Sequence, residues 1–279
     1  MSLLAADLRA FLAAARKELR QQRRYPTLFL GLLFWPVLLP ASWVLMGQAY
    51  SGNDPQALAA FAERAGSTNV AGFVFVGYAM YMWLSSLLWG SGTALRQEQV
   101  RGSLEAVFVT PVSRLVPLFG PGVATLIPMS LTFVIMGVAL WLFFGVVPPL
   151  AAVVQAAVIV VMGVPALYAI GALFAASVLR FGEVGPVVQL IRGMFVLACG
   201  ITFPVAMLPL WAQVWAWLMP PTYIVDDIRR LLLQGASLAE LLPHIAIVLS
   251  LASLVALLAV FVFRYLETSA RRTGMLGRF

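Results

Sequence analysis

Residue types that carry out covalent chemistry or bind metals are scarce in this sequence. The one lysine, Lys17, lies in the sequence Ala-Arg-Lys-Glu, whereas a phosphate-binding P-loop needs a lysine after a glycine-rich turn. His244 and Cys199 are each the only residue of their type, and catalytic zinc normally takes three protein ligands. We therefore expect no catalytic residue, no metal and no cofactor bound by this chain, and we interpret His244 as a residue at the outer end of a helix.

Hydroxyl residues within the apolar stretches, such as Ser85 and Ser130, have no base in a matching position, so nucleophilic catalysis is not indicated. Ser86, Gly90 and Ala94 instead recur at every fourth position, the small-residue spacing that allows helices to pack closely. Helix packing is therefore the better interpretation of these residues.

Arg192 is different, because it lies within an apolar run from 186 to 199. An arginine inside a bilayer costs at least about 2.5 kcal/mol unless it is paired or hydrated. Two interpretations remain open: the side chain snorkels to the cytoplasmic surface, or it lines a central pathway.

The polar loop 96–114 has the features of a docking segment. Gly102-Ser103 forms a turn and a helix cap, and Pro111 ends the short helix that follows. The apolar side chains of this helix share one face: Leu104, Val107 and Phe108. A short helix of this kind, flanked by charges, suits docking into a groove on a soluble partner.

The segment 200–240 interrupts an apolar sequence with prolines and tryptophans. Proline cannot continue a helix interior, and tryptophan favours the membrane interface. We expect a broken fifth span followed by a re-entrant hairpin, shaped by Pro204 and Pro209, that dips into the outer leaflet and never reaches the cytoplasm. Such a hairpin is allowed only where protein covers the freed backbone groups.

The composition places most of the chain in lipid. Apolar residues make up 62% and charged residues 10% of the sequence, against about 45–50% and about 25% in soluble domains. A bilayer needs about 20 apolar residues per helical crossing. The net charge of +7 comes from basic clusters at the ends of apolar stretches, which indicates orientation in a membrane and not nucleic-acid binding.

Six apolar stretches predict an all-α integral membrane protein with six transmembrane helices in a single domain, residues 1–279. The expected spans are 28–46, 70–94, 118–144, 150–178, 186–199 and 241–265. Residues 1–25 have leucines on one face and arginines on the other, which predicts a helix lying on the lipid headgroups. The alternative for this stretch is a solvated tail.

The basic residues predict that both termini are cytoplasmic. Six precede the first span, three lie in 96–114, one is Arg180 and four end the chain, out of 18 in total. By the positive-inside bias these segments face the cytoplasm, whereas 51–69 and 222–240 lie outside. The expected location is the cell (inner) membrane.

Two motifs resemble the permeases of type-2 ATP-binding-cassette (ABC) transporters, and in particular the daunorubicin-resistance-like exporter permeases. The first motif occupies the polar loop: Glu98, Arg101, Gly102, Ser103, Leu104, Glu105, Thr110, Pro111, Ser113 and Arg114. The second follows the broken span: Gly200, Phe203, Pro204, Leu208, Pro209, Pro220, Tyr223 and either Arg229 or Arg230. Ile201-Thr202 and Arg192 depart from the family pattern.

The resemblance implies that the chain is a permease without catalysis of its own, served by two copies of a separate ABC ATPase that carry ATP and Mg. It also implies a second permease subunit, identical or different. The implied coupling residues are Glu98, Arg101, Gly102, Ser103, Leu104, Glu105, Val107, Phe108, Pro111 and Arg114. The implied gate residues are Gly200, Phe203, Pro204, Pro209, Pro220 and Tyr223.

The expected function is export of an amphipathic, drug-like or lipid-like substrate by alternating access. The alternative is a secondary transporter driven by an ion gradient, which would usually show an inverted repeat and intramembrane carboxylates. The sequence shows neither, and it has no acid-base constellation for a membrane-embedded enzyme.

Overall fold

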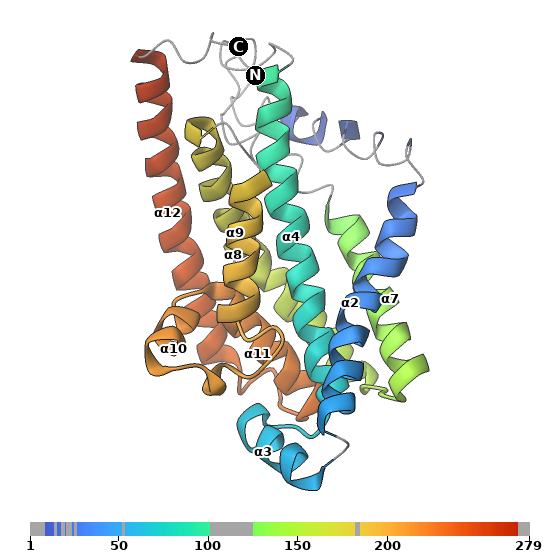
Figure 1. Ribbon diagram of the computed structural model, residues 1–279. Helices are drawn as coiled ribbons and strands as arrows, with labels where there is room; N and C mark the ends of the chain where they lie inside the picture. Colours follow the sequence, from blue (N-terminus) through green and yellow to red (C-terminus); the bar gives the residue numbers. More distant parts are fainter. Residues whose placement is uncertain are drawn as a thin grey trace.

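The computed structural model describes residues 9–13, 16–17, 20, 24, 27–51, 54–100, 125–181 and 185–272. All regular structure within these ranges is helical (Figure 1). The elements are α2 (Thr27–Ser51), α3 (Pro55–Ala65), α4 (Val70–Val100), α7 (Leu126–Phe144), α8 (Leu150–Phe181), α9 (Gly185–Ala198), the 3-10 turn η1 (Val205–Met207), α10 (Leu210–Trp217), α11 (Pro220–Leu233) and α12 (Leu242–Arg272). The long helices form a bundle, and the short elements α3, α10 and α11 gather at one of its ends.

In the described part of the chain, four helices are long and apolar enough to cross a membrane. The stretches are Val70–Gly90, Leu126–Phe144, Leu150–Ala175 and Leu242–Val262. The expectation of an all-α membrane protein is therefore confirmed. In addition, α2 has 25 residues without a charge, and α9 is apolar but only 14 residues long.

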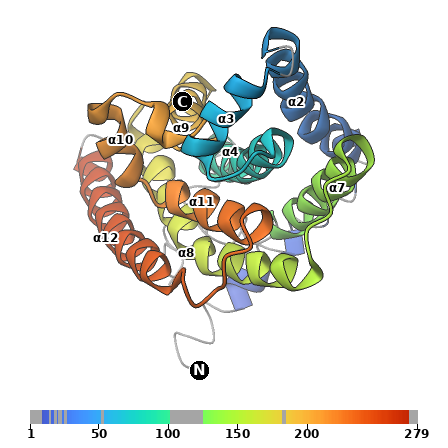
Figure 2. The same ribbon diagram turned by 90° about the horizontal axis from the view of Figure 1, so that it is seen from below.

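Helix α4 is the centre of the bundle. Figure 2 shows it enclosed by other helices, and it packs against α2, α7, α8, α9 and α11. Residues 71–80 are all buried, and Trp83 and Leu88 have no exposed surface. The outward faces of α7 and α12 instead expose large apolar side chains, among them Trp141 and Phe261, as lipid contact requires.

Helix α3 is a difference from the sequence prediction, which treated 51–69 as a polar loop. Asp54 caps the helix by accepting a hydrogen bond from the Gln56 backbone N–H at 3.0 Å, and Pro55 supplies its first turn. The helix ends at Gly66, which has a left-handed φ of 69°. Helix α4 also extends to Val100, so the first residues of the predicted loop 96–114 are helical.

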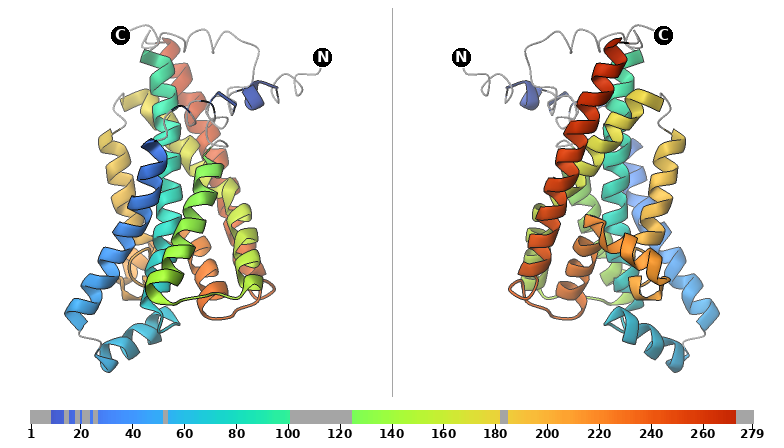
Figure 3. Two further views of the ribbon diagram at one scale, coloured as in Figure 1. Left: turned by 90° about the vertical axis from the view of Figure 1, so that its right-hand side faces the viewer. Right: turned by 90° about the vertical axis from the view of Figure 1, so that its left-hand side faces the viewer.

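The N-terminal segment is described only in part. Its described residues within 9–24 are helical, and Figure 3 shows the stretch 9–13 lying across the bundle axis at the end where α4 and α12 terminate. This orientation favours the predicted interfacial helix, which stays a prediction. Residues 101–124 lie outside the described ranges, so the span expected over 118–144 is described from 125 onwards, with α7 beginning at Leu126.

Candidate functional site

The candidate site is the connection from α9 to α11, where helical structure ends and begins again three times, at η1, α10 and α11. Helix α9 ends at Ala198, and Gly200 turns the chain with a left-handed φ of 66°. Pro209 stands directly before α10, and Pro220 is the first residue of α11, positions at which proline favours a helix start. The backbone carbonyls freed at the end of α9 therefore need donors other than a following helical turn.

Arg229 of α11 supplies these donors. Only 4% of the residue is exposed. Its Nη1 donates to the Gly200 carbonyl at 2.6 Å and its Nη2 to the Ile201 carbonyl at 2.8 Å. Nε and Nη2 also donate to the Phe73 carbonyl of α4, at 3.0 and 2.8 Å. One guanidinium thus ties α11, the end of α9 and the central helix together.

Gly77 of α4 makes room for this contact. A Cβ atom at this position would collide with the Ile201 carbonyl oxygen and would lie 2.5 Å from Arg229 Nη2. Glycine is required here by close approach of the backbones and not by an unusual φ. Burial lowers the pKa of Arg229 from its ordinary value, but the guanidinium remains charged at neutral pH.

A second polar contact joins α11 to the start of α12. His244 Nδ1 lies 2.7 Å from Asp227 Oδ1, and Asp227 is 1% exposed. Burial raises the pKa of the Asp227 carboxyl to about 6, and the hydrogen bond with His244 opposes that rise. The Tyr223 ring packs edge-on against His244 and also contacts Trp217. The sequence indicated only that His244 lies at the outer end of a helix. The structure adds that it contacts Asp227 and Tyr223 of α11.

Asp226, Asp227 and His244 could each offer one ligand atom to a metal ion, since these atoms lie within 4.8 Å of one another. However, Arg230 Nε lies 2.8 Å from Asp226 Oδ2, and His244 already pairs with Asp227. One oxygen of each aspartate is thus engaged within the protein, whereas the buried Asp227 Oδ2 has no hydrogen-bond partner among the described residues. We interpret the group as a polar cluster that joins α11 to α12 and not as a metal centre.

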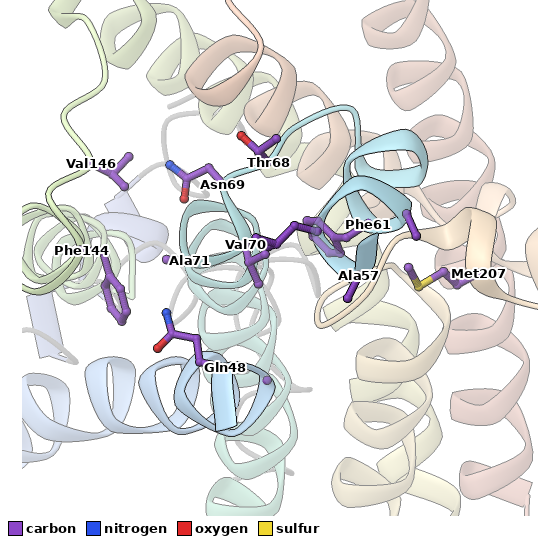
Figure 4. Close-up of a pocket in the computed structure, with 13 residues that line it drawn as sticks. Gln48, Ala57, Phe61, Thr68, Asn69, Val70, Ala71, Phe144, Val146 and Met207 are labelled. Carbon is purple, nitrogen blue, oxygen red and sulfur yellow. The ribbon is translucent and has the colours of Figure 1, made fainter. Parts of the chain in front are cut away.

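A pocket of about 630 Å³ opens at the same end of the bundle, lined by residues of α2, α3, α4, α7 and η1 (Figure 4). Most of its lining is apolar, and its polar side chains are Gln48, Thr68 and Asn69. Figure 4 shows Gln48 and Asn69 on the side of Phe144, with Met207 on the opposite side. A pocket with apolar walls and a few uncharged polar groups suits an amphipathic molecule.

Comparison with known proteins assigns the family. The family model described as ABC-2 family transporter protein matches residues 8–262. The chain belongs to this family. A search of curated proteins finds no match. The resemblance drawn from the two motifs is confirmed, and this ABC-2 family chain is a multi-pass membrane protein of the transport permease class.

The gate residues predicted for this ABC-2 permease lie at the end of the bundle where α10 and α11 gather. Among the gate residues, Gly200 accepts from Arg229, Tyr223 contacts His244, and Pro220 begins α11. Of the coupling residues, Glu98 lies in the last turn of α4, at the far end from α10 and α11 (Figure 1). The others fall in 101–124, outside the described part of the chain, and stay predictions: Arg101, Gly102, Ser103, Leu104, Glu105, Val107, Phe108, Pro111 and Arg114.

Sequence reasoning missed which residues of α11 are buried. It described 222–240 as a polar external segment and left the family's arginine as Arg229 or Arg230. The structure assigns the buried role to Arg229, whereas Arg230 forms an ion pair with Asp226 at 2.8 Å. A signal was present, because Ile224, Asp227, Ile228 and Leu231 follow the helical i, i+3, i+4, i+7 pattern of a buried face.

Replacing Gly77 with alanine should destabilise the permease. The new methyl group meets the Ile201 carbonyl and the Arg229 guanidinium, so the free energy of unfolding should fall by about 1–3 kcal/mol. Thermal unfolding in detergent, followed by tryptophan fluorescence, measures the change. Gly137→Ala on α7 is the control, since no atom lies within 4 Å of its added Cβ. Equal unfolding midpoints for the two variants would contradict the close contact.

Arg229→Lys should also lower the unfolding midpoint, although it keeps the charge. A single ammonium group cannot reach all three carbonyls, and each buried carbonyl left without a donor costs about 1–3 kcal/mol. The neighbouring Arg230→Lys is the matched control, because a partly exposed ion pair contributes about 0–1 kcal/mol. A larger loss in the Arg230 variant than in the Arg229 variant would reverse the assignment.

Proposed function

We propose that this permease exports an amphipathic, drug-like or lipid-like molecule by alternating access, driven by a separate ATPase. The observation that carries the proposal is the course of α4, a continuous helix of 31 residues. Its length is about 45 Å at 1.5 Å per residue. One end leads directly into the predicted coupling segment, and Phe73 near the other end accepts hydrogen bonds from Arg229. Movement at the ATPase end can therefore reach the α9–α11 connection through one rigid element.

The proposed topology has six crossings: α2, α4, α7, α8, α9 and α12. Successive members of this series run in opposite directions in Figures 1 and 3. The end with α3, α10 and α11 is proposed to lie outside, because most basic residues of the sequence belong to segments at the other end. Helix α9 is short for a full crossing. We propose that α10 and α11 form a re-entrant hairpin that occupies the remaining depth of the outer leaflet.

The proposed complex contains two permease subunits, identical or different, and two ATPase subunits in the inner membrane. ATP and Mg are bound by the ATPase. The pocket beside Gln48 and Asn69 supports an amphipathic substrate, because it combines apolar walls with uncharged hydrogen-bonding groups at the outer end. An ion-driven mechanism has less support, since the four membrane-capable stretches contain no Asp or Glu.

Reporter fusions test the six crossings. A fusion at Asn53 should report the outside and a fusion at Phe279 the cytoplasm, because the positive-inside bias places these segments on opposite sides. Alkaline phosphatase and green fluorescent protein, which are active on opposite sides of the membrane, provide the measurement. The same compartment for both positions would remove the six-span topology.

Substitutions in the coupling segment test the ATPase contact. Burial of Leu104 or Phe108 in an apolar groove contributes about 1.5–3 kcal/mol per side chain, whereas a salt bridge of Glu105 at the rim adds about 0–1 kcal/mol. Phe108→Ala should therefore weaken copurification of the ATPase. Glu105→Ala should leave the complex assembled but uncouple substrate-stimulated ATP hydrolysis from export in liposomes. Normal assembly, stimulation and export in both variants would show that this loop is not the coupling element.

A further inference from the structure

We infer that Arg192 binds an acidic group of the transported molecule at mid-depth in the membrane, so that the substrate is an acidic amphiphile. This inference rests on the proposed transport function and adds the charge of the substrate. Arg192 is the only charged residue of α9, and nothing in the α9–α11 connection uses it. Its position, its contacts and the face that it occupies each lead to the same conclusion.

The position of Arg192 excludes simple snorkelling to the cytoplasmic surface. Its Cζ lies over the Tyr81 ring of α4, 5.1 Å from the ring centroid. Tyr81 lies near the middle of Val70–Gly90, the 21-residue stretch of α4 that can span a membrane. The guanidinium is therefore held about halfway across this stretch. Of the two interpretations that the sequence left open, this position favours a lining of the pathway.

Among the described residues, the contacts of Arg192 include no counterion. Nη1 donates to Gln189 Oε1 at 3.2 Å, and the buried Nε has no hydrogen-bond partner among the described residues. Neither α2, nor α9, nor Val70–Gly90 contains an aspartate or a glutamate. A second copy of this chain would bring no carboxylate in these helices either. We therefore assign the neutralisation of this charge to a bound molecule.

Helix α4 is less completely buried from the level of Arg192 onwards than it is before that level. The helix is buried all round over 71–80, but Tyr81, Met82, Ser86 and Trp89 are only partly buried, and Gln189 of α9 is exposed. Helices α2 and α9 both pack against α4. Trp43 of α2 lies beside the Tyr78 hydroxyl on this helix. Aromatic and amide groups beside an unneutralised cation favour contact with a polar molecule over contact with lipid tails.

The chemistry of this arrangement specifies the ligand class. A guanidinium binds carboxylate, phosphate or sulfate through paired hydrogen bonds, and such charge-assisted bonds are stronger than neutral ones. The ring of Tyr81 can take up an adjoining apolar body. A neutral or cationic drug would gain nothing from Arg192, so the residue selects acidic amphiphiles.

Binding to the permease alone, in nanodiscs of zwitterionic phosphatidylcholine, tests the inference without the ATPase. The probe is 11-(dansylamino)undecanoic acid, and its uncharged methyl ester is the reference, with empty nanodiscs subtracted. The wild-type chain should bind the acid about tenfold more tightly than the ester. Arg192→Gln should remove this preference, and Arg192→Lys should restore a part of it. Arg64→Gln, at the exposed end of α3, should leave it unchanged.

The outcomes separate this inference from the proposed function. Equal binding of acid and ester by the wild-type chain, or an unchanged preference in Arg192→Gln, would overturn the role of Arg192 while ATP-driven export could still be measured. Unfolding midpoints of all variants show that each is folded, and a folded Arg192→Lys that fails to recover any preference would also count against the inference. Nanodiscs containing phosphatidylglycerol distinguish the sources: complete loss of acid binding there would assign Arg192 to an anionic lipid headgroup instead of a transported molecule.

Discussion

A helix that stops within apolar surroundings leaves carbonyl groups that water cannot reach, and this constraint organises the outer end of the permease. Helix α9 stops after 14 residues, and the carbonyls of Gly200 and Ile201 accept hydrogen bonds from Arg229. The guanidinium has five N–H donors in a fixed plane, so one side chain can serve several acceptors at once. The short elements η1, α10 and α11 depend on this contact, because without it the broken span would leave buried acceptors unsatisfied.

The same contact sets requirements on residues far away in the sequence. Arg229 also donates to Phe73, 156 residues earlier, and the approach of the two segments needs a glycine at position 77. The α11 helix must then bury a face that carries Asp227, whose carboxyl is stabilised by His244 of α12. A structural arginine, a glycine and a histidine–carboxylate pair thus depend on one another across α4, α11 and α12.

The sequence predicted the all-helical class because each span needs a long apolar run, and the bounds of α8 and α9 lie close to such runs and to the Gly and Pro residues around them. It missed α3, although Asp54-Pro55 and Gly66 are ordinary start and stop signals, because a polar segment between spans was interpreted by composition alone. The choice between Arg229 and Arg230 could not be made from a motif. Neighbouring residues on a helix point about 100° apart, and only the packing of α11 against α4 decides which one is buried. The pairing of Asp227 with His244 is likewise tertiary, since it joins two helices across a turn.

Arg229 and Arg192 both lie among apolar helices, but they differ in how many of their N–H groups have hydrogen-bond partners. This difference distinguishes an arginine with a structural role from one that is available to a ligand. Arg229 is 4% exposed and has carbonyl partners on two segments, so its charge is dispersed over protein dipoles and no further ligand is needed. Among the described residues, Arg192 has one amide partner and one aromatic ring, and its buried Nε has no partner there; it lies where the central helix becomes only partly buried. Both residues bear the desolvation cost of an arginine in apolar surroundings. The fold offsets this cost with hydrogen bonds only for Arg229. For Arg192 we assign the compensating interaction to a bound molecule, which is why its incomplete set of described partners bears on the substrate.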